Sequence, residues 1–163
     1  MGATAVRDAA AIKTEAQDLI DAYVQCLDDD RIEEWPGFFT DNAVYKIVAR
    51  DNVERDLPIA TMSCGSKGMM QDRVVAIRNA TMFSPRYLRH LVSNLRLLGQ
   101  EGDAYLLQAN FAVFQTLLDE ESKVFMVGKY RGRLVLTDDG PKFQELLAIY
   151  DSLQIPGLLV IPI

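Results

Sequence analysis

Four long strand-like segments fill the second half of this chain, and they constrain its fold more than any other feature. They cover residues 87–98, 104–118, 123–137 and 142–151, and short polar loops of hairpin length separate them. Apolar residues from Tyr105 to Val113 alternate with Gln108 and Asn110, which is the period of a half-buried antiparallel strand. The pattern therefore predicts an antiparallel meander.

Two segments of the first half have helical patterns instead. Apolar residues recur every three or four positions from Ile12 to Leu27, which places them on one face of a helix. A further helix is expected over residues 66–81, with Ser66 as its N-cap. Between these helices the sequence predicts a strand at 43–50, a loop at 51–58 and a short strand at 59–63.

Three consecutive aspartates at 28–30 mark the end of the first helix. Acidic side chains are unfavourable at a helix C-terminus and favourable at an N-terminus, so the helix should end near Leu27. Asp30 and Glu33 have the spacing of a capping box, which predicts a second, short helix. Residues 36–37, a proline and a glycine, should end it.

Helices followed by a meander predict an α+β domain spanning residues 1–163, with the N-terminal helices packed on a curved antiparallel sheet. A net charge of -6 repels phosphate backbones, so we expect no nucleic-acid partner. No apolar run reaches the ~18 residues of a membrane helix, and no signal-peptide pattern is present. We therefore expect a cytoplasmic protein without membrane association.

The end of the sequence, residues 155–163, is strongly apolar. Left in water, such a segment would promote aggregation. We expect it to dock, either on the sheet of its own domain or against another subunit.

The chain has few residues that could bind a redox metal. It contains one histidine, His90, and two cysteines, Cys26 and Cys64. A Rieske cluster requires two cysteines and two histidines, and a non-haem oxygenase iron requires two histidines and a carboxylate. One copy of the chain cannot supply either set, so we expect no metal or cofactor on this chain.

Acid–base chemistry is compatible with the composition. Asp41, Tyr45, Asp72 and His90 could line a pocket inside a cone-shaped domain, and an Asp or His beside a Tyr is enough for proton transfer next to a carbonyl. Each residue also has an ordinary structural interpretation, as a packed ring, a helix-surface charge or a polar strand position. Both interpretations stay open at this point.

Several stretches, taken in order, carry a family resemblance. They are residues 35–41 (WPGFFTD) with 44–46 (VYK), 66–74 (SKGMMQDRV), 85–90 (PRYLRH), 149–152 (IYDS) and the Pro-Ile ending. The series resembles the small (beta) subunit of Rieske-type aromatic-ring-hydroxylating oxygenases, and is most similar to the salicylate 5-hydroxylase and anthranilate dioxygenase type. The resemblance extends from about residue 23 to residue 163.

The resemblance implies a cystatin-like, nuclear-transport-factor-2-like fold. It also implies a chiefly structural, non-catalytic role in a hexamer of three large (alpha) and three small chains that hydroxylates an aromatic ring, such as that of salicylate or anthranilate, in the catabolism of aromatic compounds. The large subunit would carry a Rieske [2Fe–2S] cluster and a mononuclear iron, and a ferredoxin or reductase would supply electrons.

The resemblance and the residue types together suggest an interface. Arg and aromatic residues are enriched in interface cores. The matching positions are Trp35, Arg73, Arg86, Tyr87, Arg89, His90, Tyr150 and Asp151.

Two other functions remain alternatives. One is a free-standing isomerase or dehydratase of the same fold that uses the Asp/Tyr/His set, and the other is a pocketed binding module without chemistry. Purification with a larger, iron-containing chain would favour the subunit over both.

Overall fold

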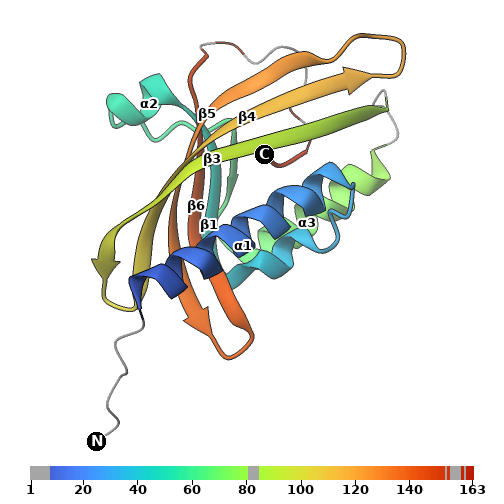
Figure 1. Cartoon of the computed structure of the whole chain (residues 1–163). Coiled ribbons are helices and arrows are strands. Elements are labelled where there is room, and N and C mark those ends of the chain that lie inside the picture. The colour runs from blue at the N-terminus through green and yellow to red at the C-terminus, as the bar shows by residue number, and fades with distance from the viewer. Residues whose placement is uncertain (1–7, 81–84, 153, 155–158, 160) are drawn as a thin grey trace, which may run out of the picture.

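The strands form one strongly curved sheet, and the helices pack against it (Figure 1). This computed structural model describes residues 8–80, 85–152, 154, 159 and 161–163. The elements are, in order, α1 (Ala9–Asp28), the 3-10 helix η1 (Trp35–Phe38), β1 (Phe39–Ala49), α2 (Arg50–Glu54), β2 (Met62–Cys64), α3 (Lys67–Asn79), β3 (Arg86–Glu101), β4 (Ala104–Leu117), β5 (Lys123–Thr137) and β6 (Gly140–Tyr150). Thr81 and residues 155–158 and 160, which the sequence placed in a helix and in the docked end, lie outside the described residues.

The sheet has the strand order β2-β1-β6-β5-β4-β3. From β3 to β6, consecutive strands are antiparallel neighbours, so the predicted meander is confirmed. β1 runs parallel to β6 and antiparallel to the short β2, which makes the sheet mixed at this end. The expected α+β class and the nuclear-transport-factor-2-like arrangement are confirmed.

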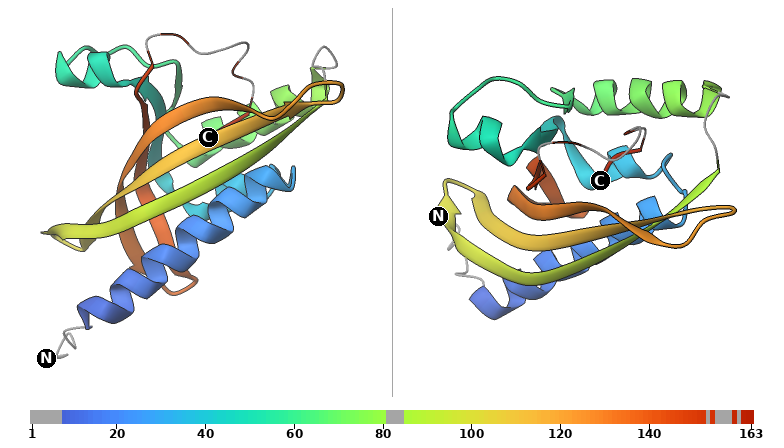
Figure 2. Two further views of the ribbon diagram at one scale, coloured as in Figure 1. Left: turned by 45° about the horizontal axis from the view of Figure 1, so that its top comes forward. Right: turned by 90° about the horizontal axis from the view of Figure 1, so that it is seen from above.

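Two helices cover opposite ends of the sheet. α1 contacts mainly β3, whereas α3 contacts β1 and β2, and the curved sheet encloses the core between them (Figure 2). The Asp8 carboxylate accepts a hydrogen bond from the Ala10 N–H at the start of α1, and α1 buries the apolar face predicted from Ile12 to Leu27. The Ser66 hydroxyl accepts from the Met69 N–H at 3.2 Å, so the predicted cap of α3 is confirmed.

The predicted capping box after α1 is wrong. Asp30 adopts a positive φ of 56°, and its carboxylate accepts a hydrogen bond at 2.9 Å from Nη1 of Arg78 on α3. Glu33 accepts from Nη2 of the same guanidinium at 2.9 Å, which lowers the pKa of the Glu33 carboxyl to about 2. Hydrogen bonds from the Arg78 guanidinium to both carboxylates replace the capping box, because this distant cation competes with the local backbone N–H groups for them.

The expected loop over residues 51–58 contains one helical turn. α2 covers Arg50–Glu54, and an ion pair joins Arg50 Nε to Glu54 Oε1 at 2.9 Å across that turn. A segment this short is below the length at which periodicity can be recognised, so the local pattern did not predict it.

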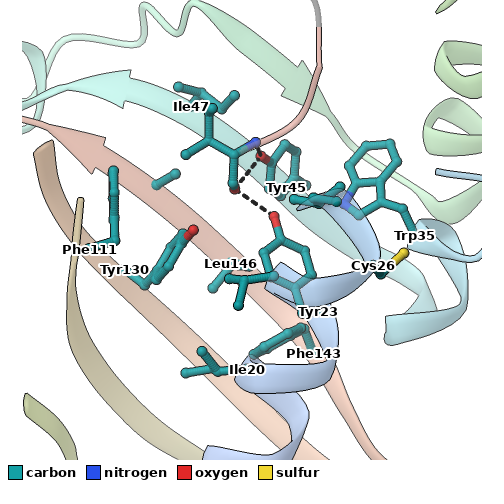
Figure 3. Packing of buried hydrophobic residues seen from close by; sticks show 14 of the residues in the cluster. Ile20, Tyr23, Cys26, Trp35, Tyr45, Ile47, Phe111, Tyr130, Phe143 and Leu146 are labelled. Carbon is teal, nitrogen blue, oxygen red and sulfur yellow. Dashed lines mark hydrogen bonds between the residues drawn. The ribbon is translucent and has the colours of Figure 1, made fainter. Parts of the chain in front are cut away.

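An aromatic cluster forms the centre of the core (Figure 3). The rings of Trp35 and Tyr45 meet edge to face with centroids 5.1 Å apart, and Tyr23 packs edge to face on Phe143 at 5.8 Å. Gly128 lets β5 and β6 approach closely at the edge of this region, since a Cβ at that position would lie 1.9 Å from the main-chain oxygen of Ile149.

Candidate functional site

Side chains that alternate away from the core leave an apolar surface on the outer side of β3, β4 and β5. Cross-strand register sets Arg89, Phe114 and Val124 in one row. The next row contains Leu91, Ala112 and Val127. We call the surface made by the following residues the outer face: Tyr87, Arg89, Leu91, Phe114, Val124 and Val127.

The large apolar side chains of the outer face are exposed to solvent. Tyr87 and Leu91 are 63% and 57% exposed, and Val124 and Val127 are 54% and 45% exposed. Large apolar side chains grouped in this way on a soluble domain mark an interaction surface. The arginine among them is the charged residue type most enriched in such surfaces.

A groove of about 590 Å³ continues the outer face beyond β5. Val124 and Val127 line it together with the polar residues Asp151, Ser152 and Gln154. The Asp151 N–H donates a hydrogen bond to the Val127 carbonyl at 2.9 Å, which joins two of the lining residues. An aliphatic floor with a polar rim is the usual composition of a protein interface.

Five of the eight residues predicted for an interface lie at the surface: Arg73, Arg86, Tyr87, Arg89 and Asp151. Tyr87 and Arg89 belong to the outer face. Asp151 lines the groove and pairs with Arg50 Nη1 at 3.3 Å. Arg86 begins β3 and is half-buried, whereas Arg73 is exposed on α3 at the other end of the sheet.

The other three predicted interface residues are buried inside this chain. Trp35 is 0% exposed and packs on Tyr45, and the Tyr150 hydroxyl lies 2.7 Å from that of Thr61. His90 is 6% exposed. Their side chains are packed within the fold of this single chain, and the assignment of Trp35, His90 and Tyr150 to an interface stays a prediction.

The four candidate acid–base residues are not assembled into a pocket. The Asp41 side chain is 94% exposed, and Asp72 lies on the exposed side of α3. Tyr45 and His90 are buried and are each bound to another group of this chain. The fold therefore separates the two carboxylates from the two side chains that would act with them.

His90 forms a buried pair with Asp28, a residue that the sequence assigned only to a helix junction. Asp28 Oδ1 lies 2.6 Å from His90 Nδ1, and the carboxylate also accepts the His90 main-chain N–H at 2.9 Å. The two side chains are 5% and 0% exposed. Asp28 thus ties the end of α1 to the free edge of β3. A separation of 62 positions gives this contact no local sequence signal.

In the core that the curved sheet encloses, three buried tyrosines lie around Ile163. We call Tyr23, Tyr45 and Tyr130 the tyrosine cluster. The hydroxyls of Tyr23 and Tyr45 donate to the main-chain oxygen of Ile163 at 2.6 and 2.9 Å (Figure 3). Burial raises the pKa of all three phenols, because the phenolate is poorly solvated there.

The apolar end therefore docks on its own domain, as one of the two expectations had it. Ile163 is 0% exposed, and Leu159 and Ile161 pack at the margin of the core. This holds for the described residues of that segment.

The residues present do not fit a Rieske cluster or a mononuclear iron. In the described part of the chain, no group of three or more His, Cys, Asp or Glu side chains is placed to hold a metal ion. The single histidine has its Nδ1 bound to a carboxylate, and both cysteines are buried separately. Among the described helices, none combines the length and the apolar character needed to cross a bilayer.

Comparison with known proteins identifies the family. A family model described as the ring hydroxylating beta subunit matches residues 22–152. The small subunit of anthranilate 1,2-dioxygenase from Burkholderia cepacia is 36% identical over 141 residues, which cover 86% of this chain and 88% of that protein. A terephthalate 1,2-dioxygenase beta subunit from a Comamonas species is 30% identical, with 87% and 92% covered.

A solved structure agrees with this match. It is the beta subunit of a protein assigned as an aromatic-ring-hydroxylating dioxygenase from Novosphingobium aromaticivorans, and it is 41% identical with a TM-score of 0.87. The alignment covers 95% of this chain and 99% of that one. The chain therefore belongs to the ring-hydroxylating beta-subunit family and is a small subunit of an aromatic-ring-hydroxylating dioxygenase.

Proposed function

We propose that this chain is the chiefly structural, non-catalytic subunit of a hexamer of three large and three small chains. The observation that carries the proposal is the outer face, where Tyr87, Leu91, Val124 and Val127 are exposed together on one side of the sheet. Burying such a surface against a partner removes apolar area from water, which is the main driving force of stable association. We assign the large subunit as that partner.

The outer face and the groove define the contact. Tyr87 and Arg89 supply the residue types that most often dominate binding energy. Leu91 follows Arg89 on the same side of β3 and pairs with Ala112 of β4. Arg86 and Asp151 flank this patch. Arg73, on α3, makes a separate contact with another chain of the hexamer.

The iron centres of the complex belong to the large subunit. One histidine and two cysteines cannot ligate a Rieske [2Fe–2S] cluster, so the proposed partner carries that cluster and the mononuclear iron. A ferredoxin or a reductase delivers the electrons. The complex works in the cytoplasm.

The complex hydroxylates a substituted benzoate. Two relatives are named for anthranilate and terephthalate, which are both benzenecarboxylic acids. This chain supports the site that binds the substrate, and it adds no catalytic residue of its own.

Co-expression with the large subunit tests the proposal. Affinity purification of a tagged large subunit should recover an equimolar amount of the small chain, in a brown, iron-containing complex. Leu91→Asp should lower that recovery at least tenfold, because it places a charge on the apolar outer face. Leu98→Asp is the matched control: Leu98 lies on the same strand, is 50% exposed and is outside the outer face.

Two results would overturn the proposal. Equal recovery of Leu91→Asp and Leu98→Asp would remove the outer face from the contact with the large subunit. A colourless small chain that purifies alone and isomerises or dehydrates a substrate would favour the free-standing enzyme instead.

A further inference from the structure

Hydrogen-bonding groups converge on one point within the otherwise apolar core. Tyr23 comes from α1 and Tyr45 from β1, and both hydroxyls reach the same main-chain oxygen of Ile163. The N–H of Ile163 returns a hydrogen bond to the Tyr45 hydroxyl at 2.8 Å. Residues from two distant elements therefore recognise both the carbonyl and the N–H of a single residue.

The same region has a donor that Ile163 does not use. The Tyr130 hydroxyl is buried, has no hydrogen-bond partner, and points toward the space between Tyr23 and Tyr45 (Figure 3). The Tyr23 and Tyr130 rings meet edge to face at 6.2 Å. Buried hydroxyls are almost always paired in native proteins, so an unpaired one calls for an acceptor.

The hydrocarbon surroundings are those of a small-molecule pocket. Figure 3 shows Ile47, Phe111 and Leu146 around the tyrosine hydroxyls. Ligand sites combine such an apolar lining with a small number of polar groups that fix orientation. Here the fully buried Ile163 lies in that space.

The end of the chain is held as a ligand is held, and not as part of the sheet. Ile163 belongs to none of the six strands, and its main-chain oxygen and N–H bond to the hydroxyls of Tyr23 and Tyr45. Leu159 and Ile161 are only half-buried. Among the described residues of this end, withdrawing Ile163 would break three hydrogen bonds and no strand pairing.

We propose that the interior beside the tyrosine cluster is a binding site that the chain's own Ile163 occupies. In its place the site takes a small carboxylic acid or amide with a hydrocarbon body about the size of an isoleucine residue. Its carbonyl or carboxylate oxygens accept from the hydroxyls of Tyr23 and Tyr45, and a second oxygen accepts from Tyr130. The site is independent of assembly with the large subunit.

A shortened chain that ends at residue 161 tests the proposal. N-acetyl-L-isoleucine is the probe, and the fluorescence of Trp35 is the readout, because this single tryptophan packs 5.1 Å from Tyr45. The shortened chain should bind the probe at least tenfold more tightly than the full chain does. N-acetyl-L-lysine, which carries a charge in place of the hydrocarbon, should not bind.

Two further variants keep the proposal falsifiable. Tyr45→Phe in the shortened chain should weaken probe binding at least tenfold, because the probe loses one of the two donors to its carbonyl oxygen and the acceptor of its N–H. If the shortened chain fails to fold, Ile163→Gly in the full chain removes the buried side chain that anchors this end. The probe should then displace the end more readily and bind at least tenfold more tightly than it binds the wild type.

The result that would overturn the proposal is a folded shortened chain, by circular dichroism, that does not respond to millimolar probe. Equal affinities of Ile163→Gly and the wild type would overturn it as well. Binding that is insensitive to Tyr45→Phe would place the probe elsewhere on the protein, which also contradicts the proposal.

Discussion

Replacing Asp28 by alanine should destabilise the fold more than its position at the end of a helix suggests. The Asp28 carboxylate accepts the main-chain N–H of His90 and lies 2.6 Å from its Nδ1, and both side chains are almost fully buried. Asp28→Ala leaves these two groups without a partner, in a place that water does not reach. His90 Nε2 already has no partner.

The size of the effect follows from those two groups. An unpaired buried donor costs about 1–3 kcal/mol, so Asp28→Ala should lower the free energy of unfolding by about 3–5 kcal/mol. Removing an acidic residue from the last turn of α1 recovers roughly 0.5 kcal/mol. Asp28→Asn keeps one acceptor oxygen and should cost about 1–2 kcal/mol.

Urea unfolding followed by circular dichroism measures these differences. Asp29→Ala is the matched control, since Asp29 is adjacent, has a 56% exposed side chain and forms only a 3.5 Å surface pair with Arg31. That variant should lose less than about 1 kcal/mol. The reasoning fails if Asp28→Ala lies within about 0.5 kcal/mol of Asp29→Ala, because the buried pair would then contribute nothing.

Three other predictions concern strand contact, buried thiols and alkaline pH. Gly128→Ala should reduce the yield of folded protein severely, since the added Cβ would lie 1.9 Å from a backbone oxygen. Gly37→Ala, whose Cβ would have nothing within 4 Å, should leave the stability unchanged. Similar melting temperatures of the two variants would contradict this prediction. The Cys26 thiol donates to the Arg31 carbonyl, and burial raises the pKa of this thiol to about 11 and raises that of Cys64 as well. Alkylation of the thiols at pH 8 should therefore be about 100-fold slower in the native protein than in urea, and comparable rates would refute this prediction. The phenols of the tyrosine cluster have pKa values that are raised in the folded state. Their contribution to stability is therefore complete below the unfolded pKa near 10, and above it the free energy of unfolding falls by roughly 1.4 kcal/mol per pH unit for each phenol. Tyr130→Phe should flatten this decline, and an unchanged slope between pH 9 and 11 would count against burial as its cause.

The elements of the second half were predictable because their signal is local. Period-two alternation and short polar loops define β3 to β6, and the structure shifts their bounds by a few residues. Ser66 was predictable as a cap for the same reason, because the acceptor and the N–H it binds are three positions apart.

The contacts that define the interior were not predictable in this way. Asp28 meets His90 across 62 positions, and Tyr45 meets Ile163 across 118. Asp30 and Glu33 matched a local capping motif, yet they bind Arg78, more than 40 positions away. In each case a long-range partner, set by the curvature of the sheet and the placement of α1 and α3, decides the role of a polar residue that a local pattern leaves ambiguous.

The buried pair and the outer face are two sides of the same strand. His90 points inward on β3, and its neighbours Arg89 and Leu91 point outward. β3 is an edge strand, and an edge with unpaired N–H groups tends to fray or to pair with a foreign strand. By accepting the His90 N–H, Asp28 satisfies one N–H group of that edge and ties the strand to the end of α1. A histidine and a carboxylate that could have served proton transfer thus hold in position the outward residues that we propose contact the large subunit.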